Sequence, residues 1–113
     1  MRIDVKGRNV PVNDELRRRV DKKFAKVARQ VSEHASMEVE LSEHRNPAIS
    51  DSQIAEVTLY LKGVTLRACE ESEDMVHSVN LVAEDLSRQV KRHRDKRRKR
   101  REARQASPRM GLG

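Results

Sequence analysis

Charged and apolar residues alternate in four stretches of the chain, which is the period of a half-buried β-strand. Arg2 to Gly7 alternates in this way and ends at a glycine, and Met37 to Ser42 repeats the pattern with an acidic outer face. The clearest pair of strands is a hairpin in which Ala55 to Lys62 and Val64 to Cys69 meet at the turn Lys62-Gly63. The pattern therefore predicts four strands.

Two other stretches carry apolar residues mostly every three or four positions, the spacing of one face of a helix. The first stretch follows Asn13, a good N-cap residue, and we expect its helix to end near His34 to Ser36. The second follows Ser72, a candidate N-cap, and ends its apolar stripe at Val90. The apolar positions are Leu16, Val20, Phe24, Val27, Ala28 and Val31 in the first helix, and Met75, Val79, Val82, Ala83, Leu86 and Val90 in the second.

The resulting order is strand, helix, strand, strand, strand, helix. It predicts an α+β fold of the β-α-β-β-β-α type, in which a four-stranded sheet carries both helices on one face. If the first two strands are parallel neighbours, the first helix is a right-handed crossover between them.

The second helix is predicted to extend beyond the end of the sheet if it continues past Val90. Its stripe from Met75 to Val90 is about 24 Å long, whereas strands of this size span roughly 27–33 Å. We expect residues 1–98 to form the folded domain and 99–113 to be a basic, mobile tail or the start of a linker, frayed alone and ordered by a polyanion. Ala106 to Gly113, with its Ser, Pro and Gly residues, is predicted to be disordered.

The 113 residues, enough for one domain, contain 25 Lys and Arg against 18 Asp and Glu, a net charge of +7. Residues 1–87 hold 13 basic and 16 acidic residues, a net charge of −3, whereas residues 88–113 hold 12 and 2, a net charge of +10. The chain has no apolar run of membrane-spanning length, no visible signal peptide and a single cysteine. We therefore expect a soluble cytoplasmic protein with an anionic partner and no membrane contact.

Segregated positive charge on the two helices indicates RNA as that partner, with no DNA expected. Aromatic residues make up only 2% of the chain, and Tyr60 is the one aromatic residue in a predicted strand. We therefore expect contacts to phosphates rather than base stacking. The candidate RNA-binding residues are Lys22, Lys23, Lys26, Arg29, Arg88, Lys91, Arg92, Arg94, Lys96, Arg97, Arg98, Lys99 and Arg100.

Catalytic chemistry has little support in the sequence. The four histidines lie in different segments at no metal-ligand spacing, and no Gly-rich phosphate loop is present. Cys69 lies near Arg67 in a predicted strand, and it could act in catalysis only as an activated thiolate. The more ordinary interpretation is a small, half-buried side chain that fills space in the strand. We expect no enzyme activity, no cofactor and no metal.

The sequence resembles a known family in its opening and in its second helix. Arg2 to Asn9, followed by a capped helix with Lys23-Phe24-Ala25-Lys26, is similar to the start of the ribosome hibernation-promoting factors, also called ribosome-associated inhibitors. Asp74-Met75, and then Leu86 to Lys96, resemble that family's second helix. The resemblance covers about residues 2–98.

The resemblance implies a fold similar to the double-stranded RNA-binding domain and no catalysis. It implies binding to the small ribosomal subunit and its RNA, in the channel for messenger and transfer RNA near the decoding centre. There a family member blocks translation and preserves idle ribosomes under stress. Carried over by position, the residues facing ribosomal RNA would be Lys23, Lys26, Arg88, Arg92, Arg94 and Lys96.

Two questions stay open at this stage. Long family members carry a second domain that pairs ribosomes, so homodimerisation is expected only if such a domain is missing beyond Gly113. The chain is then either a short member or a fragment of a long one. The alternative function is a general double-stranded RNA-binding or ribosome-assembly module, and the least favoured is an enzyme acting through Cys69.

Overall fold

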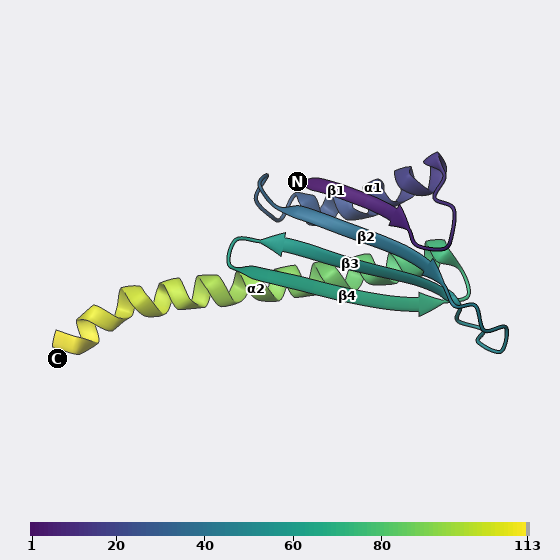
Figure 1. The fold of residues 1–113 in the computed structure, drawn as a ribbon. Coiled ribbons are helices and arrows are strands. Elements are labelled where there is room, and N and C mark those ends of the chain that lie inside the picture. Colours follow the sequence, from purple (N-terminus) through teal and green to yellow (C-terminus); the bar gives the residue numbers. More distant parts are fainter. Residues whose placement is uncertain (113) are drawn as a thin grey trace.

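The secondary-structure elements follow one another in the predicted order (Figure 1). The computed structural model describes the backbone of residues 1–112 and the side chains of residues 1–103. The elements are β1 (Arg2–Gly7), α1 (Asp14–Ala28), β2 (Ser36–Glu43), β3 (Gln53–Leu61), β4 (Val64–Ser72) and α2 (Met75–Leu112).

The four strands form one sheet in the order β1-β2-β3-β4. β1 and β2 are parallel, so α1 connects two parallel neighbours as expected, whereas the other two pairs are antiparallel. The predicted hairpin is confirmed, because Leu61 and Val64 are paired across the two-residue turn. Gly63 has a φ of 79°, a backbone conformation that side chains disfavour and glycine allows.

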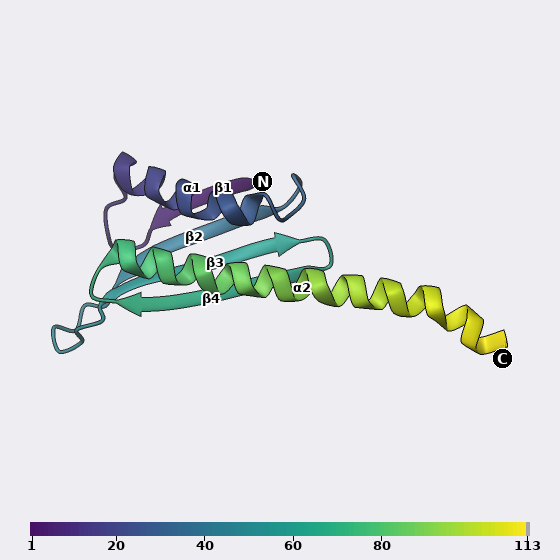
Figure 2. The ribbon, with the colours of Figure 1, turned by 180° about the vertical axis from the view of Figure 1, so that it is seen from behind.

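Both helices lie on the same face of the sheet, which confirms the predicted α+β architecture (Figure 2). Alternate residues of the strands are buried beneath the helices, because successive side chains in a strand point to opposite faces. Phe24 of α1 and Leu86 of α2 are fully buried against them. The buried apolar strand residues are Val5, Met37, Val39, Leu41, Ala55, Val57, Leu59 and Ala68.

Helix α1 begins where the sequence predicted and ends earlier. The Asn13 side chain accepts a hydrogen bond of 2.8 Å from the backbone N–H of Leu16, which is the N-cap contact. The helix ends at Ala28, and Val31 lies in the following turn rather than on the helix. The early end leaves room for the turn that brings Ala35 beside β1, where the backbone N–H of Arg2 donates to its carbonyl oxygen.

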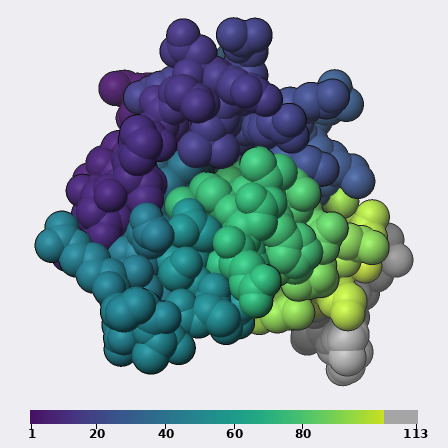
Figure 3. Space-filling model, turned by 90° about the vertical axis from the view of Figure 1, so that its right-hand side faces the viewer, coloured from purple at the N-terminus to yellow at the C-terminus, as the bar shows by residue number. Residues whose placement is uncertain are grey.

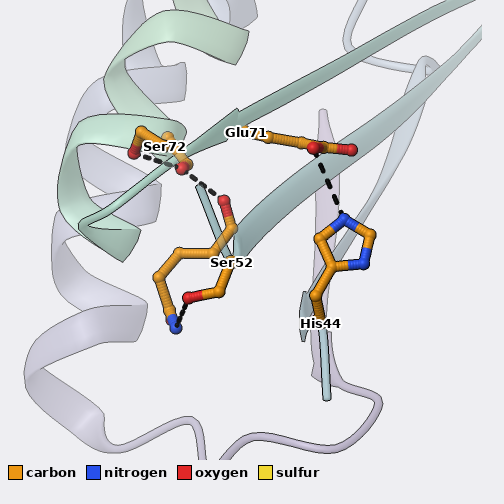
Figure 4. A network of polar contacts seen from close by, with 6 residues as sticks. His44, Ser52, Glu71 and Ser72 are labelled. Atoms are coloured by element: carbon orange, nitrogen blue, oxygen red, sulfur yellow. Dashed lines mark hydrogen bonds and ion pairs between the residues drawn. The ribbon is translucent and has the colours of Figure 1, made fainter. Parts of the chain in front are cut away.

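Helix α2 begins under a different cap from the predicted Ser72. Asp74 caps the helix, because its Oδ2 accepts from the backbone N–H of His77 at 3.2 Å. Ser72 is instead buried at the end of β4, where its Oγ lies 2.6 Å from the Oγ of Ser78. Ser78 in turn donates to the carbonyl oxygen of Gln53 at 2.7 Å. This polar network fastens the start of α2 to β3 and β4 (Figure 4).

Beyond Val90, the last buried residue of α2, the helix leaves the sheet and continues to Leu112 (Figure 1). The backbone from Ala106 to Leu112 is thus helical where the sequence predicted disorder, and Gly113 lies outside the described residues. Consecutive α-helical hydrogen bonds need no contact with the sheet, which allows the element to extend past its apolar stripe. The division into a domain at 1–98 and a mobile tail stays a prediction.

None of the helices in the described part of the chain is long and apolar enough to cross a membrane.

Candidate nucleic-acid interface

Three basic residues of α1 lie along the flank of the helix that faces α2. At 100° per residue, Arg19, Lys23 and Lys26 fall on one side of the buried stripe. Arg17 falls on the other side and is engaged structurally, because its Nη1 donates to the carbonyl oxygen of Val5 in β1 at 3.1 Å. The positive charge of α1 is therefore concentrated beside the second helix.

The basic residues of α2 begin where its burial ends. Between Met75 and Val90 the helix has one basic residue, Arg88, which is exposed. From Lys91 to Arg101 basic residues occur on every side of the helix, because no face is needed for the core. This segment projects past the sheet beside the end of α1, so that the two basic regions border each other (Figure 2).

Every predicted RNA-binding side chain is exposed, from Lys22 to Arg100. Within residues 1–103, Arg98 is the only one of them with a carboxylate oxygen within 4 Å, that of Asp95 at 3.7 Å. Surface cations without a paired carboxylate remain available to an anionic ligand. The structure thus brings the predicted residues of both helices into one layer and leaves their charge largely uncompensated.

A hollow lies between the first turns of the two helices. Its floor is apolar, formed by Leu16 of α1 and by Val76 and Val79 of α2, and its volume is about 560 Å³. Figure 3 faces this end of the molecule, with α1 packed over the start of α2. The remaining lining residues are polar or charged, namely Glu15, Arg18, Arg19, Lys22, Lys23 and Asn80.

A second, smaller hollow of about 150 Å³ lies where α2 leaves the sheet. Its apolar surface comes from Val31, Leu61 and Val90, and its basic rim from Lys62, Arg94 and Arg97. Val31, displaced from the predicted helix, thus contributes to this hollow. The two hollows occupy opposite ends of the surface between α1 and α2.

The open face of the sheet has the opposite character. Asp4, Glu38, Glu40 and Glu56 point away from the helices, and Glu40 lies directly opposite Glu56 on the neighbouring strand. Tyr60 is exposed on the same face and donates to a carboxylate oxygen of Glu38 at 3.3 Å. The one strand aromatic therefore lies among carboxylates, a poor place for a phosphate chain.

Cys69 also lies on this open face and is exposed rather than half-buried. Partial burial, followed by the charges of Glu56, Glu71 and Glu70, raises the pKa of its thiol. A raised pKa leaves less of the reactive thiolate, which is the reverse of an activated nucleophile. In the part of the chain that the structure describes, no three His, Cys, Asp or Glu side chains form a group that could hold a metal ion.

Four residues of the helical surface were absent from the predicted set. Arg18 and Arg19 line the first hollow, and Lys62 and His93 line the second. Arg18 and Arg19 belong to the same basic run of α1, so the charge pattern contained their signal. Lys62 is distant in sequence from both helices, and only the position of the β3–β4 turn brings it to this surface.

The fold and the sequence both match proteins of known type. Over 97 residues, 85% of this chain, the sequence is 32% identical to a ribosome hibernation promotion factor of Picosynechococcus sp., of which it covers 50%. It is 30% identical over 96 residues, 83% of this chain, to the factor of Staphylococcus aureus, of which it covers 48%. The chain thus spans about half the length of these curated relatives.

Two solved structures have the same fold, each with a TM-score of 0.72. The crystal structure of the Thermus thermophilus Protein Y N-terminal domain is 30% identical and is covered to 99%, with 82% of this chain aligned. A ribosomal subunit interface protein from Coxiella burnetii is 22% identical, with 84% of this chain and 99% of the other aligned, which shows the shared fold. The family model described as sigma 54 modulation protein / S30EA ribosomal protein matches residues 3–98. The predicted family resemblance is confirmed, and the chain belongs to this family of ribosome-associated proteins.

Proposed function

We propose that the chain binds the small ribosomal subunit in the channel for messenger and transfer RNA near the decoding centre, and thereby inhibits translation in resting or stressed cells. The single observation that carries this proposal is the layer of exposed, largely unpaired cations on α1 and α2. The names of the hibernation promotion factors with which the chain shares half their length support the ribosome as the partner. Such a protein would act in the cytoplasm, where ribosomes are.

The physical mechanism is occlusion. A domain seated on ribosomal RNA through Lys and Arg contacts to phosphates occupies the volume that messenger and transfer RNA would need. The projecting half of α2 adds reach, because its cations lie on all sides and contact phosphates in more than one direction. The residues proposed to contact RNA are the thirteen candidates from Lys22 to Arg100, and no step requires catalysis or a cofactor.

Co-sedimentation with ribosomal subunits tests the proposal. The chain should pellet with isolated small subunits and empty ribosomes, and transfer RNA bound to the small subunit should displace it. Binding to the small subunit that transfer RNA leaves unchanged would place the chain outside the channel.

The alternative, a general double-stranded RNA-binding or ribosome-assembly module, is supported by the same basic layer. Under that alternative the chain should bind any duplex RNA of sufficient length as tightly as it binds the subunit. A matched duplex competitor in the sedimentation experiment separates the two functions, because only the alternative predicts efficient displacement by the duplex.

A further inference from the structure

The smaller hollow, where α2 leaves the sheet, is enclosed by three separate segments of the chain. They are the turn after α1, the β3–β4 turn and the part of α2 that follows its last buried residue, Val90. Figure 2 shows the β3–β4 turn beside the point where α2 passes the end of the sheet. The lining residues that can carry positive charge are Lys62, His93, Arg94 and Arg97. In the part of the chain that the structure describes, the lining contains no carboxylate, whereas that of the larger hollow contains Glu15.

The cations of this hollow have no counter-ion within the described domain. Within residues 1–103, none of Lys62, Arg94 and Arg97 has a carboxylate oxygen within 4 Å. Arg94 and Arg97 follow Val90 by four and seven positions, so they continue the buried face of the helix beyond the sheet. The β3–β4 turn brings Lys62 to the same place from a distant part of the sequence. Like charges gathered in this way repel one another unless an anion lies between them.

The size and the floor of the hollow restrict the anion that it takes. Small-ligand sites usually have volumes of roughly 300–1,000 Å³, so a volume of about 150 Å³ suits one anionic group rather than a whole nucleotide. The floor of Val31, Leu61 and Val90 excludes water from one side, which strengthens the attraction between the cations and an anion. A phosphate group accepts from a lysine and from arginines at once, because it carries oxygens on several sides. A phosphate within an RNA strand fits best, because its neighbouring nucleotides stay outside the hollow and reach the rest of the basic layer.

We infer that this hollow binds one backbone phosphate of RNA, held by Lys62 from the β3–β4 turn and by Arg94 and Arg97 from α2. The inference rests on the proposed function for its RNA partner. It adds Lys62, and with it the hairpin of the sheet, to a contact surface so far assigned to the helices. The phosphate joins the turn to α2 up to two helical turns beyond Val90, so it also fixes the direction in which the basic segment leaves the sheet.

The first test compares Lys62→Gln with Lys6→Gln, the same change on the exposed open face of the sheet. Filter binding across a salt series measures both chains against small subunits and against a single-stranded uridine RNA. Lys62→Gln should weaken binding roughly three- to tenfold and make the salt slope shallower by about 1, because one phosphate contact is lost. Lys6→Gln should change neither quantity. Equal behaviour of the two variants would overturn the inference.

A double-mutant cycle then asks whether Lys62 and Arg94 hold the same phosphate. If they do, the second change to Gln costs less once the first has been made, so the double variant should bind about threefold or more tightly than the product of the single losses predicts. Lys23, which lines the hollow at the opposite end of the helices, supplies the control pair. The losses from Lys62→Gln and Lys23→Gln should simply multiply. Losses that multiply in both pairs would show that Lys62 and Arg94 contact separate phosphates and would refute the site.

Uridine monophosphate distinguishes an RNA backbone from a free phosphate compound. At a phosphate concentration equal to that of the uridine strand, the monophosphate should leave the bound strand in place, because it lacks the neighbouring contacts. Displacement of the strand under these conditions would overturn the assignment of the site to RNA.

The two RNA ligands together separate this inference from the proposed function. Subunit binding that Lys62→Gln leaves at the strength of the parent would reject the phosphate site and leave the proposed function in place. Binding of the uridine strand that depends on Lys62 and is coupled to Arg94, without subunit binding, would support the site and reject the proposed function. A parent chain that binds neither ligand would overturn both.

Discussion

The helical face of this domain, built from α1 and α2, and the open face of its sheet, built from the four strands, carry opposite charge. Among the side chains that the structure describes, up to residue 103, α1 and the outer part of α2 present mostly unpaired cations, whereas the open face presents Glu38, Glu40 and Glu56. Residues 1–87 have a net charge of −3, yet the flank of α1 within them is strongly basic. The net charge of a segment therefore does not reveal a charged surface when its basic and acidic residues lie on opposite sides of the domain.

The two faces also differ in where their apolar and aromatic groups lie. On the helical face, cations surround two hollows that are lined in part by apolar side chains. On the open face, the only strand aromatic, Tyr60, hydrogen-bonds to a carboxylate. This arrangement is the reverse of sheet-based single-strand binders, which stack bases on exposed strand aromatics.

Charge reversal on the helical face should have the largest effect. A chain with Lys23, Lys26, Arg92 and Arg94 all changed to Glu should bind small subunits at least about a thousandfold more weakly, because attraction to phosphates becomes repulsion. Filter binding or sedimentation measures the loss. Circular dichroism should show an intact fold, since all four side chains are exposed. Unchanged binding by the folded variant would reject the helical face as the interface.

Salt dependence should have the next largest effect. If about eight phosphates are neutralised, the slope of log affinity against log salt should be roughly −6 to −7, so that doubling the salt weakens binding about a hundredfold. Changing Lys23, Arg92 and Arg94 to Gln should make the slope shallower by about 2. The matched triple on the open face, Arg2, Lys6 and Arg67 to Gln, should leave it unchanged. Equal changes in slope from the two triples would contradict a one-sided interface.

Relief of repulsion on the open face should have a smaller effect, on stability alone. Glu40 and Glu56 lie directly opposite each other on β2 and β3, and like charges in this position destabilise a sheet. Glu56→Thr should raise the free energy of unfolding by about 0.5 kcal/mol in urea denaturation. RNA affinity should stay as it was. A fall in both stability and RNA affinity would show that the open face contributes to the interface.

The smallest expected effect is on the ionisation of Cys69. Burial and the carboxylates of Glu56 and Glu71 raise its pKa in the folded chain. The contribution of the bound proton to stability is therefore present below the ordinary thiol pKa and is lost as pH rises through the raised value. Glu56→Gln should lower the pKa, which is measured as a shift of the alkylation profile to lower pH. An unshifted profile would remove Glu56 as a cause.

Much of the fold could be predicted because the apolar pattern is local and periodic. The alternation in β3 and β4 and the turn at Gly63 predicted their pairing, which the structure confirms. The cap at Asn13 was equally local, because the side chain bonds within the next turn. Ser72 was misassigned because the N–H of His77 in the first turn donates to the side chain of Asp74, whereas the Ser72 hydroxyl donates to the carbonyl oxygen of Asp74 and lies 2.6 Å from the hydroxyl of Ser78.

Some features of the candidate site could likewise be predicted from the sequence, and others depend on the tertiary structure. By itself the sequence determined the sheet with two helices, the family and the basic character of both helices, since charge and period are properties of the chain. Only the tertiary structure decided which cations share a surface, how the acidic residues are turned away, and that Leu16, Val79 and Asn80 enclose a hollow. These features depend on how α1 packs beside α2, and contacts between distant segments leave no periodic signal in either one.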